Sequence, residues 1–421
     1  MYKLRTPRMK YSYSHIFIIF CCLMVFLSGC SDVLGSTGSS SNTTGSTSAS
    51  MTPAPTKADA NGSQTDAVLR AQLAKVQQIM SGMTLDQKLG QLIMVEYFGS
   101  DYPNTALQYM VSQQYVGGYL YQDVNGNFNA PSDTVSGAAQ FAAQAQQDAK
   151  IPLLIAIDQE GGKVAKLSTL FGAVPAASDM TASGDPNFAT GQAVQDAKWM
   201  QSTGINTDLA PVVDVGPTTN LLVTRQFSDN PQIVSTYAGA FLNGLQSNGI
   251  IGTLKHFPGL GSLPQGGNYD PHTSLPVVNR SKTDLENIDW VPYKTLIQQN
   301  HPAMIMTTDV VDSALDPGVP AELSPKVVNG VLRGELGYNG VVITDGLYMG
   351  GIKAQWTIAQ ASVLAIIAGN DIVEGAFQVQ DVASTVEALK TAIQQGQLSM
   401  DRVNQSVQRI LLMKVQFGII K

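Results

Sequence analysis

Short apolar runs and helix-like segments alternate along most of the chain, and this alternation limits the possible folds more than any other feature. The apolar runs that we predict as strands are residues 92–97, 118–121, 153–157, 207–213, 252–256, 303–307, 340–344 and 371–374. The helix-like patterns lie at residues 68–80, 105–114, 134–148, 187–202, 232–248, 282–300, 325–336, 358–367, 379–394 and 399–415. Short apolar strands separated by helices are typical of parallel sheets. We therefore predict an α/β fold, a single (β/α)8 barrel, with a doubly wound open sheet as the alternative.

The first 29 residues have the features of an export signal. Four basic residues precede an apolar run at residues 16–26, which is too short to span a bilayer comfortably. Leu27-Ser28-Gly29 then comes before Cys30, and this arrangement resembles the lipobox of bacterial lipoproteins, in which the cysteine is lipidated. We predict an exported protein that a lipid at Cys30 anchors to the bacterial cell membrane, outside the cytoplasm. The alternatives are an uncleaved membrane anchor and a signal peptide cut elsewhere.

Composition divides the rest of the chain into a tether and a domain. Residues 30–66 are rich in Ser, Thr, Gly and Ala, and such a segment cannot bury enough surface to offset its conformational entropy. We predict that this segment is disordered and that residues 67–421 form the barrel domain, which we expect to be monomeric. The formal net charge of −7 argues against nucleic acid as a partner. All three cysteines lie at or before Cys30, which excludes a cysteine nucleophile and a thiolate metal site in the domain.

Polar side chains follow most of the predicted strands, at the end of a barrel where function is found. They are Asp158 and Glu160 after the third strand, Asp214 after the fourth, Lys255 and His256 at the end of the fifth, Asp309 after the sixth and Asp345 after the seventh. Each of them could cap the helix that follows, and we favour that role for Asp214 and Asp309. Asp345 is the sharpest functional candidate, because Gly346 beside it lets another group approach closely.

One glycine- and proline-rich loop, residues 255–276, holds two of the four histidines, His256 and His272. Asp270 stands two residues before His272, and a neighbouring carboxylate commonly sets the tautomer of an imidazole and raises its basicity. On the loop alone we slightly favour the alternative, in which Asp270 caps a turn and His272 is a surface residue. The two histidines could also join a carboxylate as zinc ligands, but we predict no metal and no cofactor.

Several separate motifs, in this order, resemble glycoside hydrolase family 3 and its β-N-acetylhexosaminidase branch. The resemblance covers residues 75 to 375, nearly the whole globular part. The matching motifs are MTLDQKLGQLIM at residues 83–94, DQEGGKV at 158–164, NTDLAPVVDV at 206–215, RQFS at 225–228, KHFPG at 255–259, DPH at 270–272 and LRGELGYNGVVIT at 332–344 with the following DGL.

The resemblance implies a (β/α)8 barrel and a retaining mechanism through a covalent glycosyl intermediate. It implies that Asp345 is the nucleophile, that His272 is the acid/base and that Asp270 is the partner of His272. The sugar would be held by residues at matching positions, namely Asp158, Lys166, Arg225, Lys255 and His256. A cationic Lys255 near Asp345 would help to keep that carboxylate ionised.

The sequence departs from the family pattern at several positions. Leu260 and Asp309 stand where histidine is common, and Pro271 stands where serine is common. Lys163 and Lys166 stand where the family has arginine, and Gly346 stands where it often has Asp or Trp. These changes leave the predicted Asp270–His272 dyad in place and bear on the N-acetyl preference.

The leading hypothesis is an exo-β-N-acetylglucosaminidase that acts on peptidoglycan or chitin fragments at the cell surface. A β-glucosidase or a glycoside phosphorylase would use the same fold and nucleophile. The non-enzyme alternative is an inactive sugar-binding lipoprotein, which would be expected to have lost Asp345 or the dyad.

Overall fold

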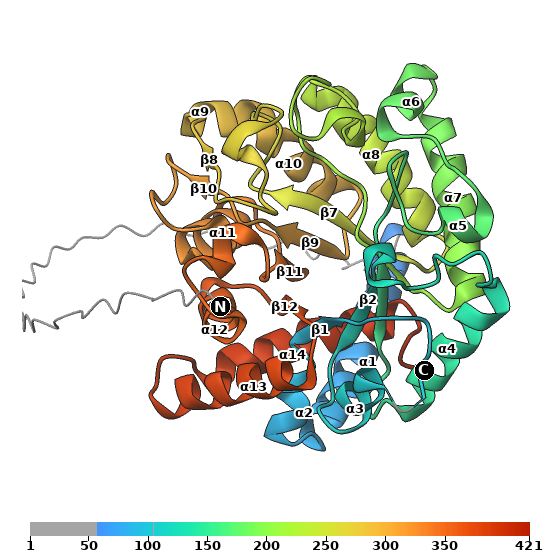
Figure 1. Cartoon of the computed structure of the whole chain (residues 1–421), viewed down its shortest axis with the longest axis vertical. Helices are drawn as coiled ribbons and strands as arrows, with labels where there is room; N and C mark the ends of the chain where they lie inside the picture. The colour runs from blue at the N-terminus through green and yellow to red at the C-terminus, as the bar shows by residue number, and fades with distance from the viewer. Residues whose placement is uncertain (1–56, 104) are drawn as a thin grey trace, which may run out of the picture. The chain divides into compact units, whose positions relative to one another are not determined.

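Eight parallel strands close into a barrel with helices around it, in a computed structural model that describes residues 57–103 and 105–421 (Figure 1). The strands follow one another around the barrel in the order β1-β12-β11-β9-β7-β6-β3-β2. They are β1 (Ile93–Glu96), β2 (Gly118–Tyr121), β3 (Leu154–Ile157), β6 (Thr207–Asp208), β7 (Ile251–Phe257), β9 (Met304–Thr307), β11 (Val341–Gly346) and β12 (Ile372–Ala376). The predicted (β/α)8 barrel is confirmed, and the open sheet is excluded by the pairing of β1 with both β2 and β12.

Each predicted apolar run overlaps one barrel strand, and the differences lie at the strand ends. The run at residues 207–213 yields only the two residues of β6. Pro211 lies within that run, and proline has no backbone N–H to donate to a neighbouring strand. After Pro211, Val212 pairs with Lys255 of β7 in an isolated parallel bridge.

The helices surround the barrel, and each predicted helical segment overlaps at least one of them. They are α1 (Lys57–Ser81), α2 (Leu85–Gly90), α3 (Ala106–Ser112), α4 (Val135–Asp148), α7 (Pro186–Thr203), α8 (Pro231–Gln246), α10 (Trp290–Gln299), α12 (Ile358–Ala368), α13 (Val379–Gln394) and α14 (Met400–Gln416). The segment 325–336 is a π-helix, Lys326–Glu335, and a short π-helical turn at Leu285–Asp289 precedes α10. A capping box opens α2, in which Thr84 and Gln87 cap each other.

Side chains alternate between the inside and the outside of the barrel along each strand, as a period of two requires. Val341 and Ile343 of β11 belong to the apolar cluster inside the barrel, whereas Val342 packs in the outer cluster against the helices. In the same way, Ile372 of β12 points inward and Val373 outward. Continued toward the carboxyl end, this alternation points the side chains of Asp345 and Glu374 into the mouth of the barrel.

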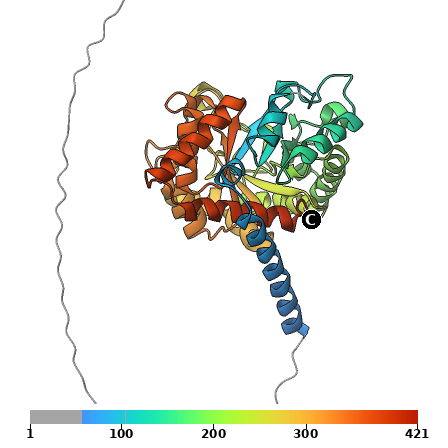
Figure 2. The same ribbon diagram turned by 90° about the horizontal axis from the view of Figure 1, so that it is seen from below.

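The opposite, amino-terminal end of the barrel is covered by α14 (Figure 2). Ile410 and Met413 of α14 belong to the same apolar cluster as the barrel interior. Lys414 is fully buried here, and its Nζ donates hydrogen bonds to Gln91 Oε1 at 2.8 Å and to Gly117 O at 3.0 Å. Burial lowers the pKa of Lys414 from 10.5 to about 7.

This buried lysine should make stability depend on pH above neutrality. Between pH 7 and 10.5 the unfolded lysine holds a proton that the folded one has released, so the free energy of unfolding rises with pH. The size of the effect is about 3–5 kcal/mol over the whole window. We expect Lys414→Met to lose this rise in urea unfolding between pH 7 and 9, whereas the exposed Lys421→Met keeps it. An unchanged pH dependence in Lys414→Met would contradict the assignment.

The described part of the chain begins with α1, whose first turns extend away from the barrel (Figure 2). Helix α1 starts at Lys57, within the segment that we predict as a tether up to residue 66. The predicted signal peptide, Cys30 and the rest of the tether lie outside the described residues. Among residues 57–103 and 105–421, no helix is long and apolar enough to cross a membrane.

Candidate active site

A pocket of about 330 Å³ lies at the carboxyl end of the barrel strands. All eight residues of the domain that the sequence analysis singled out as site residues line it: Asp158, Lys166, Arg225, Lys255, His256, Asp270, His272 and Asp345. The strands and the loops that follow them bring these residues together from positions up to 187 apart in the sequence. The structure therefore assembles the predicted set in one place.

Ion pairs hold the basic side of the pocket. Lys255 Nζ lies 2.6 Å from both Asp158 Oδ1 and Glu160 Oε1. Arg225 binds Glu160 with two hydrogen bonds, Nε to Oε2 at 2.7 Å and Nη2 to Oε1 at 2.8 Å. Burial alone would raise the pKa of Glu160, but Arg225 and Lys255 outweigh it and hold the pKa well below its usual range. These groups form a rigid charged wall that can accept and donate hydrogen bonds to sugar hydroxyls.

Glu160 also belongs to this wall; the sequence analysis placed it at the functional end of the barrel but gave it no role in binding the sugar. It lies in a hairpin formed by β4 (Gln159–Gly161) and β5 (Val164–Ala165), which was not predicted. Gly161 has a φ of +96°, and a Cβ there would collide with Pro175 O. The turn that aims Glu160 at Lys255 therefore requires glycine.

His256 is fixed by Asp214. The Nδ1 atom of His256 lies 2.7 Å from Asp214 Oδ2, and the backbone N–H groups of His256 and Leu260 also donate to this carboxylate. Our prediction that Asp214 caps a helix is wrong, because the carboxylate is buried and holds the loop after β7. This contact sets the orientation of the imidazole, whose Nε2 lies 3.5 Å from Arg225 Nη2 at the pocket.

The predicted dyad is formed on the exposed rim of the pocket. His272 Nδ1 lies 2.7 Å from Asp270 Oδ1, and the side chains of His272 and Asp270 are 66% and 46% exposed. Burial alone would raise the pKa of Asp270, but the hydrogen bonds from His272 outweigh burial and lower this pKa. The same carboxylate accepts the His272 N–H at 3.0 Å, so Asp270 both shapes the turn and orients the imidazole. The two alternatives weighed from the sequence are thus present together.

The loop that carries His272 is attached to the segment that follows Asp345. The backbone N–H of Gly350 donates to His272 O at 3.1 Å. A Cβ at Gly350 would come within 2.7 Å of the Thr273 backbone, so glycine permits this close approach. The dyad and Asp345, which are far apart in the sequence, are therefore linked through a short backbone contact.

Asp345 lies half-buried at the end of β11. Its Oδ1 accepts the Gly346 N–H at 2.9 Å, and its Oδ2 accepts the Thr308 hydroxyl at 3.3 Å. Lys255 was expected to lie near Asp345 and help to keep it ionised. In the described structure Lys255 forms its ion pairs with Asp158 and Glu160 and none with Asp345. Hydrogen bonds from Thr308 and Gly346 hold the Asp345 carboxylate in its place.

Two further acids lie behind Asp345. Glu322 is fully buried, and its Oε2 accepts the backbone N–H of Asp345 at 3.1 Å. Asp309 is also buried, and its carboxylate oxygens have no hydrogen-bond partner among the described residues. Burial raises the pKa values of both groups, and the Asp345 charge raises them further. The predicted helix-capping role of Asp309 is therefore wrong.

Lys166 completes the basic residues on the pocket wall. Its Nζ lies 2.6 Å from Asp123 Oδ1, which follows β2. Asp123 was not predicted, because nothing in its local sequence indicates a partner from the β5 segment.

On the side of the pocket opposite the ion pairs lies a third group that sequence reasoning missed. Glu374 of β12 and Tyr348 line the pocket, and Glu96 of β1 lies behind them. The strand alternation could have identified Glu374 and Glu96, because both stand two residues after an inward-facing residue, Ile372 and Met94 respectively.

The described residues contain no group of three or more His, Cys, Asp or Glu side chains arranged to hold a metal ion. His256 and His272 instead pair with separate carboxylates, Asp214 and Asp270.

The sequence matches the family model described as Glycosyl hydrolase family 3 N terminal domain over residues 84–413. It is 30% identical over 373 residues to beta-hexosaminidase A of Pseudoalteromonas piscicida, covering 79% of this chain and 61% of that protein. It is 31% identical over 336 residues to beta-hexosaminidase LpqI of Mycobacterium tuberculosis, covering 78% and 82%.

The fold is similar to the solved structure of a glycoside hydrolase family 3 beta-N-acetylglucosaminidase from Paenibacillus sp. str. FPU-7. The TM-score is 0.75 at 31% identity, and the match covers 81% of this chain and 64% of that chain. The chain thus spans less than two thirds of the length of the Pseudoalteromonas and Paenibacillus proteins.

Proposed function

The chain belongs to glycosyl hydrolase family 3, and on that premise we propose that it is a retaining exo-β-N-acetylglucosaminidase. It removes terminal N-acetylhexosamine from glycans such as peptidoglycan or chitin fragments. The observation that carries this proposal is that Asp345 and the Asp270–His272 dyad line one pocket. The printed names of the relatives, beta-hexosaminidase and beta-N-acetylglucosaminidase, support the choice of sugar.

In the proposed reaction, an Asp345 carboxylate oxygen attacks the anomeric carbon. A glycosyl–Asp345 ester forms while the bond to the leaving oxygen breaks, and protonated His272 gives its proton to that oxygen. Neutral His272 then takes a proton from water, which attacks the same carbon and releases Asp345. Two displacements at one carbon retain the β configuration.

Asp270 would serve as a positioning residue, because its carboxylate accepts a hydrogen bond from Nδ1 and so fixes the imidazole with Nε2 aimed away from it. Asp158, Lys166, Arg225, Lys255 and His256 would hold the hydroxyls of the terminal sugar. Charged groups that are already fixed by one another need little rearrangement when the substrate binds.

The role of His272 predicts a dependence on the leaving group. We expect His272→Ala to lower kcat/KM by ~10²-fold or more on a disaccharide of N-acetylglucosamine, whose leaving alcohol needs a proton. The loss should be at most ~10-fold on the 4-nitrophenyl β-N-acetylglucosaminide, whose leaving group departs with little protonation. The exposed His301, outside the pocket, provides the control variant His301→Ala. Equal losses on both substrates would rule out the acid role.

Two other functions on the same fold give different results with simple substrates. A β-glucosidase would prefer the 4-nitrophenyl β-glucoside, and a phosphorylase would turn over faster with phosphate and form a sugar 1-phosphate. An inactive sugar-binding protein would bind N-acetylglucosamine and turn over none of these substrates.

We also propose the predicted cellular placement, with residues 1–29 as a signal peptide, Cys30 lipidated and the barrel domain held outside the cytoplasm on the remaining linker. The amino-terminal sequence supports this placement. Incorporation of labelled fatty acid into the chain, absent in Cys30→Ala, tests it.

A further inference from the structure

Glu374 is a buried acid that faces the pocket without a partner for one of its oxygens. The residue is 4% exposed and lines the pocket, and its Oε1 has no hydrogen-bond partner in the part of the chain that the structure describes. It lies beside Asp345, because a Cβ atom added to the adjacent residue Gly346 would lie 3.0 Å from Glu374 Oε2. Buried polar groups normally have partners, so this oxygen indicates a group that arrives with the ligand.

The basic residues of the pocket do not supply that partner. Lys255 pairs with Asp158 and Glu160, and Arg225 pairs with Glu160. Lys166 pairs with Asp123. Among the described residues, no lysine or arginine forms an ion pair with Glu374 or Asp345. The pocket therefore has one side on which charges are neutralised and a second side, at β11 and β12, on which carboxyl groups remain uncompensated.

A second acid strengthens the negative character of that side. Glu96, at the end of the neighbouring strand β1, is 2% exposed, and its Oε1 also has no hydrogen-bond partner within residues 57–103 and 105–421. Its Oε2 accepts a hydrogen bond from Asn125 Nδ2 at 2.6 Å. Burial raises the pKa values of Glu96 and Glu374. The Glu96 carboxyl raises the pKa of Glu374 further, whereas the contact with Glu374 lowers that of Glu96. An incoming positive charge would favour the ionised form of both.

We propose that this side of the pocket binds a free ammonium group on the terminal sugar, so that the enzyme accepts β-linked hexosamine whose amine carries no acyl group. This inference rests on the proposed function and extends it from acetylated to deacetylated sugar residues. An ammonium brings three N–H donors and a positive charge, whereas an acetamido nitrogen brings one N–H and no charge. A charge-assisted hydrogen bond to a buried carboxylate is also about twice as strong as a neutral one.

The test compares 4-nitrophenyl β-glycosides that differ in the charge of one substituent. The substrates are the 2-amino-2-deoxy-glucoside, the 6-amino-6-deoxy-glucoside, the glucoside and the N-acetylglucosaminide, at a pH at which the amines are protonated. We expect the full chain to turn over the 2-amino-2-deoxy-glucoside, and not the 6-amino-6-deoxy-glucoside, with a kcat/KM about tenfold or more above that of the glucoside. In Glu374→Gln, which keeps the shape and removes the charge, this advantage should fall to about threefold or less.

The control is Asp196→Asn, which changes a buried carboxyl outside the pocket and should leave the ratio of rates unchanged. Unfolding midpoints show whether each variant is folded. If the N-acetylglucosaminide is hydrolysed but the 2-amino-2-deoxy-glucoside does not exceed the glucoside, the inference is overturned and the proposed function stands. An amino-sugar advantage that survives in Glu374→Gln also overturns it.

If no glycoside is hydrolysed, the proposed function fails and calorimetric binding decides the inference separately. Tighter binding of glucosamine than of glucose, lost in Glu374→Gln, would support the ammonium site. Equal or absent binding of the two sugars would overturn it.

Discussion

Replacing Asp345 with asparagine is expected to lower kcat on the 4-nitrophenyl β-N-acetylglucosaminide by ~10⁴-fold or more. The amide is a poor nucleophile, so no covalent glycosyl ester forms. The amide oxygen can still accept the Gly346 N–H, and the amide NH2 can donate to the Thr308 hydroxyl oxygen, so the shape of the side chain and its polar contacts are kept. The loss should therefore be chemical and not structural, with an unfolding midpoint close to that of the unchanged protein.

A second variant separates a missing nucleophile from a damaged pocket. Asp345→Ala leaves room for a small anion, and we expect azide to restore turnover and to give the α-glycosyl azide, because only one displacement then takes place. The exposed Asp229→Asn serves as the matched control and should keep normal activity. Activity of Asp345→Asn within about tenfold of the unchanged protein would contradict the nucleophile assignment.

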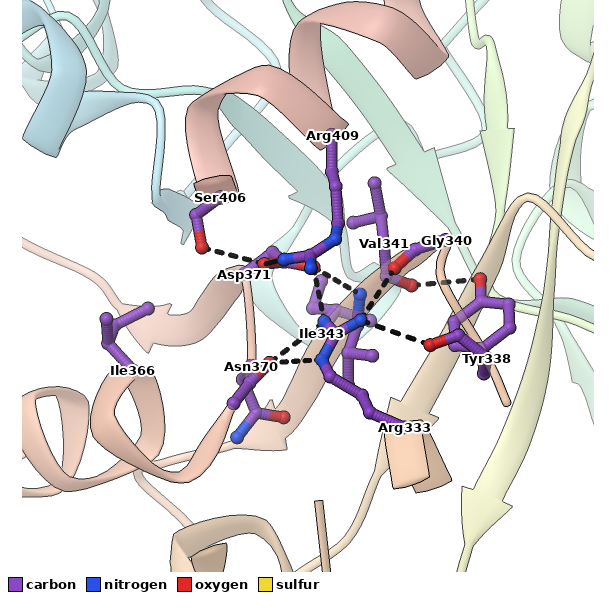
Figure 3. A network of polar contacts seen from close by, with 12 residues as sticks. Arg333, Tyr338, Gly340, Val341, Ile343, Ile366, Asn370, Asp371, Ser406 and Arg409 are labelled. Atoms are coloured by element: carbon purple, nitrogen blue, oxygen red, sulfur yellow. Dashed lines mark hydrogen bonds and ion pairs between the residues drawn. The ribbon is translucent and has the colours of Figure 1, made fainter. Parts of the chain in front are cut away.

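The second large effect concerns stability and arises at the opposite end of the barrel, at Asp371 (Figure 3). Asp371 is fully buried, and its carboxylate pairs with Arg333 at 2.7 Å, Arg402 at 3.2 Å and Arg409 at 3.1 Å. It also accepts hydrogen bonds from Ser406 Oγ and the Val342 N–H. Arg402 and Arg409 belong to α14, so this carboxylate links α14 to the barrel in addition to the contacts of Ile410, Met413 and Lys414.

We expect Asp371→Ala to lower the free energy of unfolding by about 3–5 kcal/mol, because three partly buried guanidinium groups lose their counter-charge. Asp371→Asn should cost nearly as much, since the amide has one accepting oxygen where the carboxylate has two, and it carries no charge. Burial alone would raise the pKa of Asp371, but the three arginines outweigh burial and lower this pKa. The wild-type contribution is therefore present above the unfolded pKa near 3.8 and is lost as pH falls through the lower folded value.

Urea unfolding at pH 7 measures this effect, with the exposed Asp401→Asn on the same helix as control. That control should change stability by about 0.5 kcal/mol or less. A cost below about 1 kcal/mol for Asp371→Ala would show that α14 is held by its apolar contacts alone.

The barrel could be predicted from the sequence because its strands are buried on both faces and therefore appear as continuous apolar runs. Four-residue strands such as β2 stood out for this reason, although periodicity could not show that the sheet closes. Strand ends were less certain, as in residues 207–213, where Pro211 interrupts pairing. The β4–β5 hairpin was missed because its seven residues are mostly polar or glycine and contain no apolar run.

The candidate site could be located for a different reason, namely that the carboxyl ends of all barrel strands meet at one mouth. Which partner each side chain takes could not be read from the sequence. Asp214 looked like a helix cap, and only the fold places it against His256, 42 residues away. Glu374 was overlooked because its strand was counted as an apolar run, although the alternation within that strand points it inward.

The central claim is that this pocket hydrolyses a β-linked hexosamine through a covalent intermediate. The most direct measurement follows the anomeric protons by NMR as the full chain begins to hydrolyse the 4-nitrophenyl β-N-acetylglucosaminide. We predict that the first sugar released is the β anomer, which later equilibrates with the α form. Release of the α anomer first would contradict the covalent mechanism and the role of Asp345 as nucleophile.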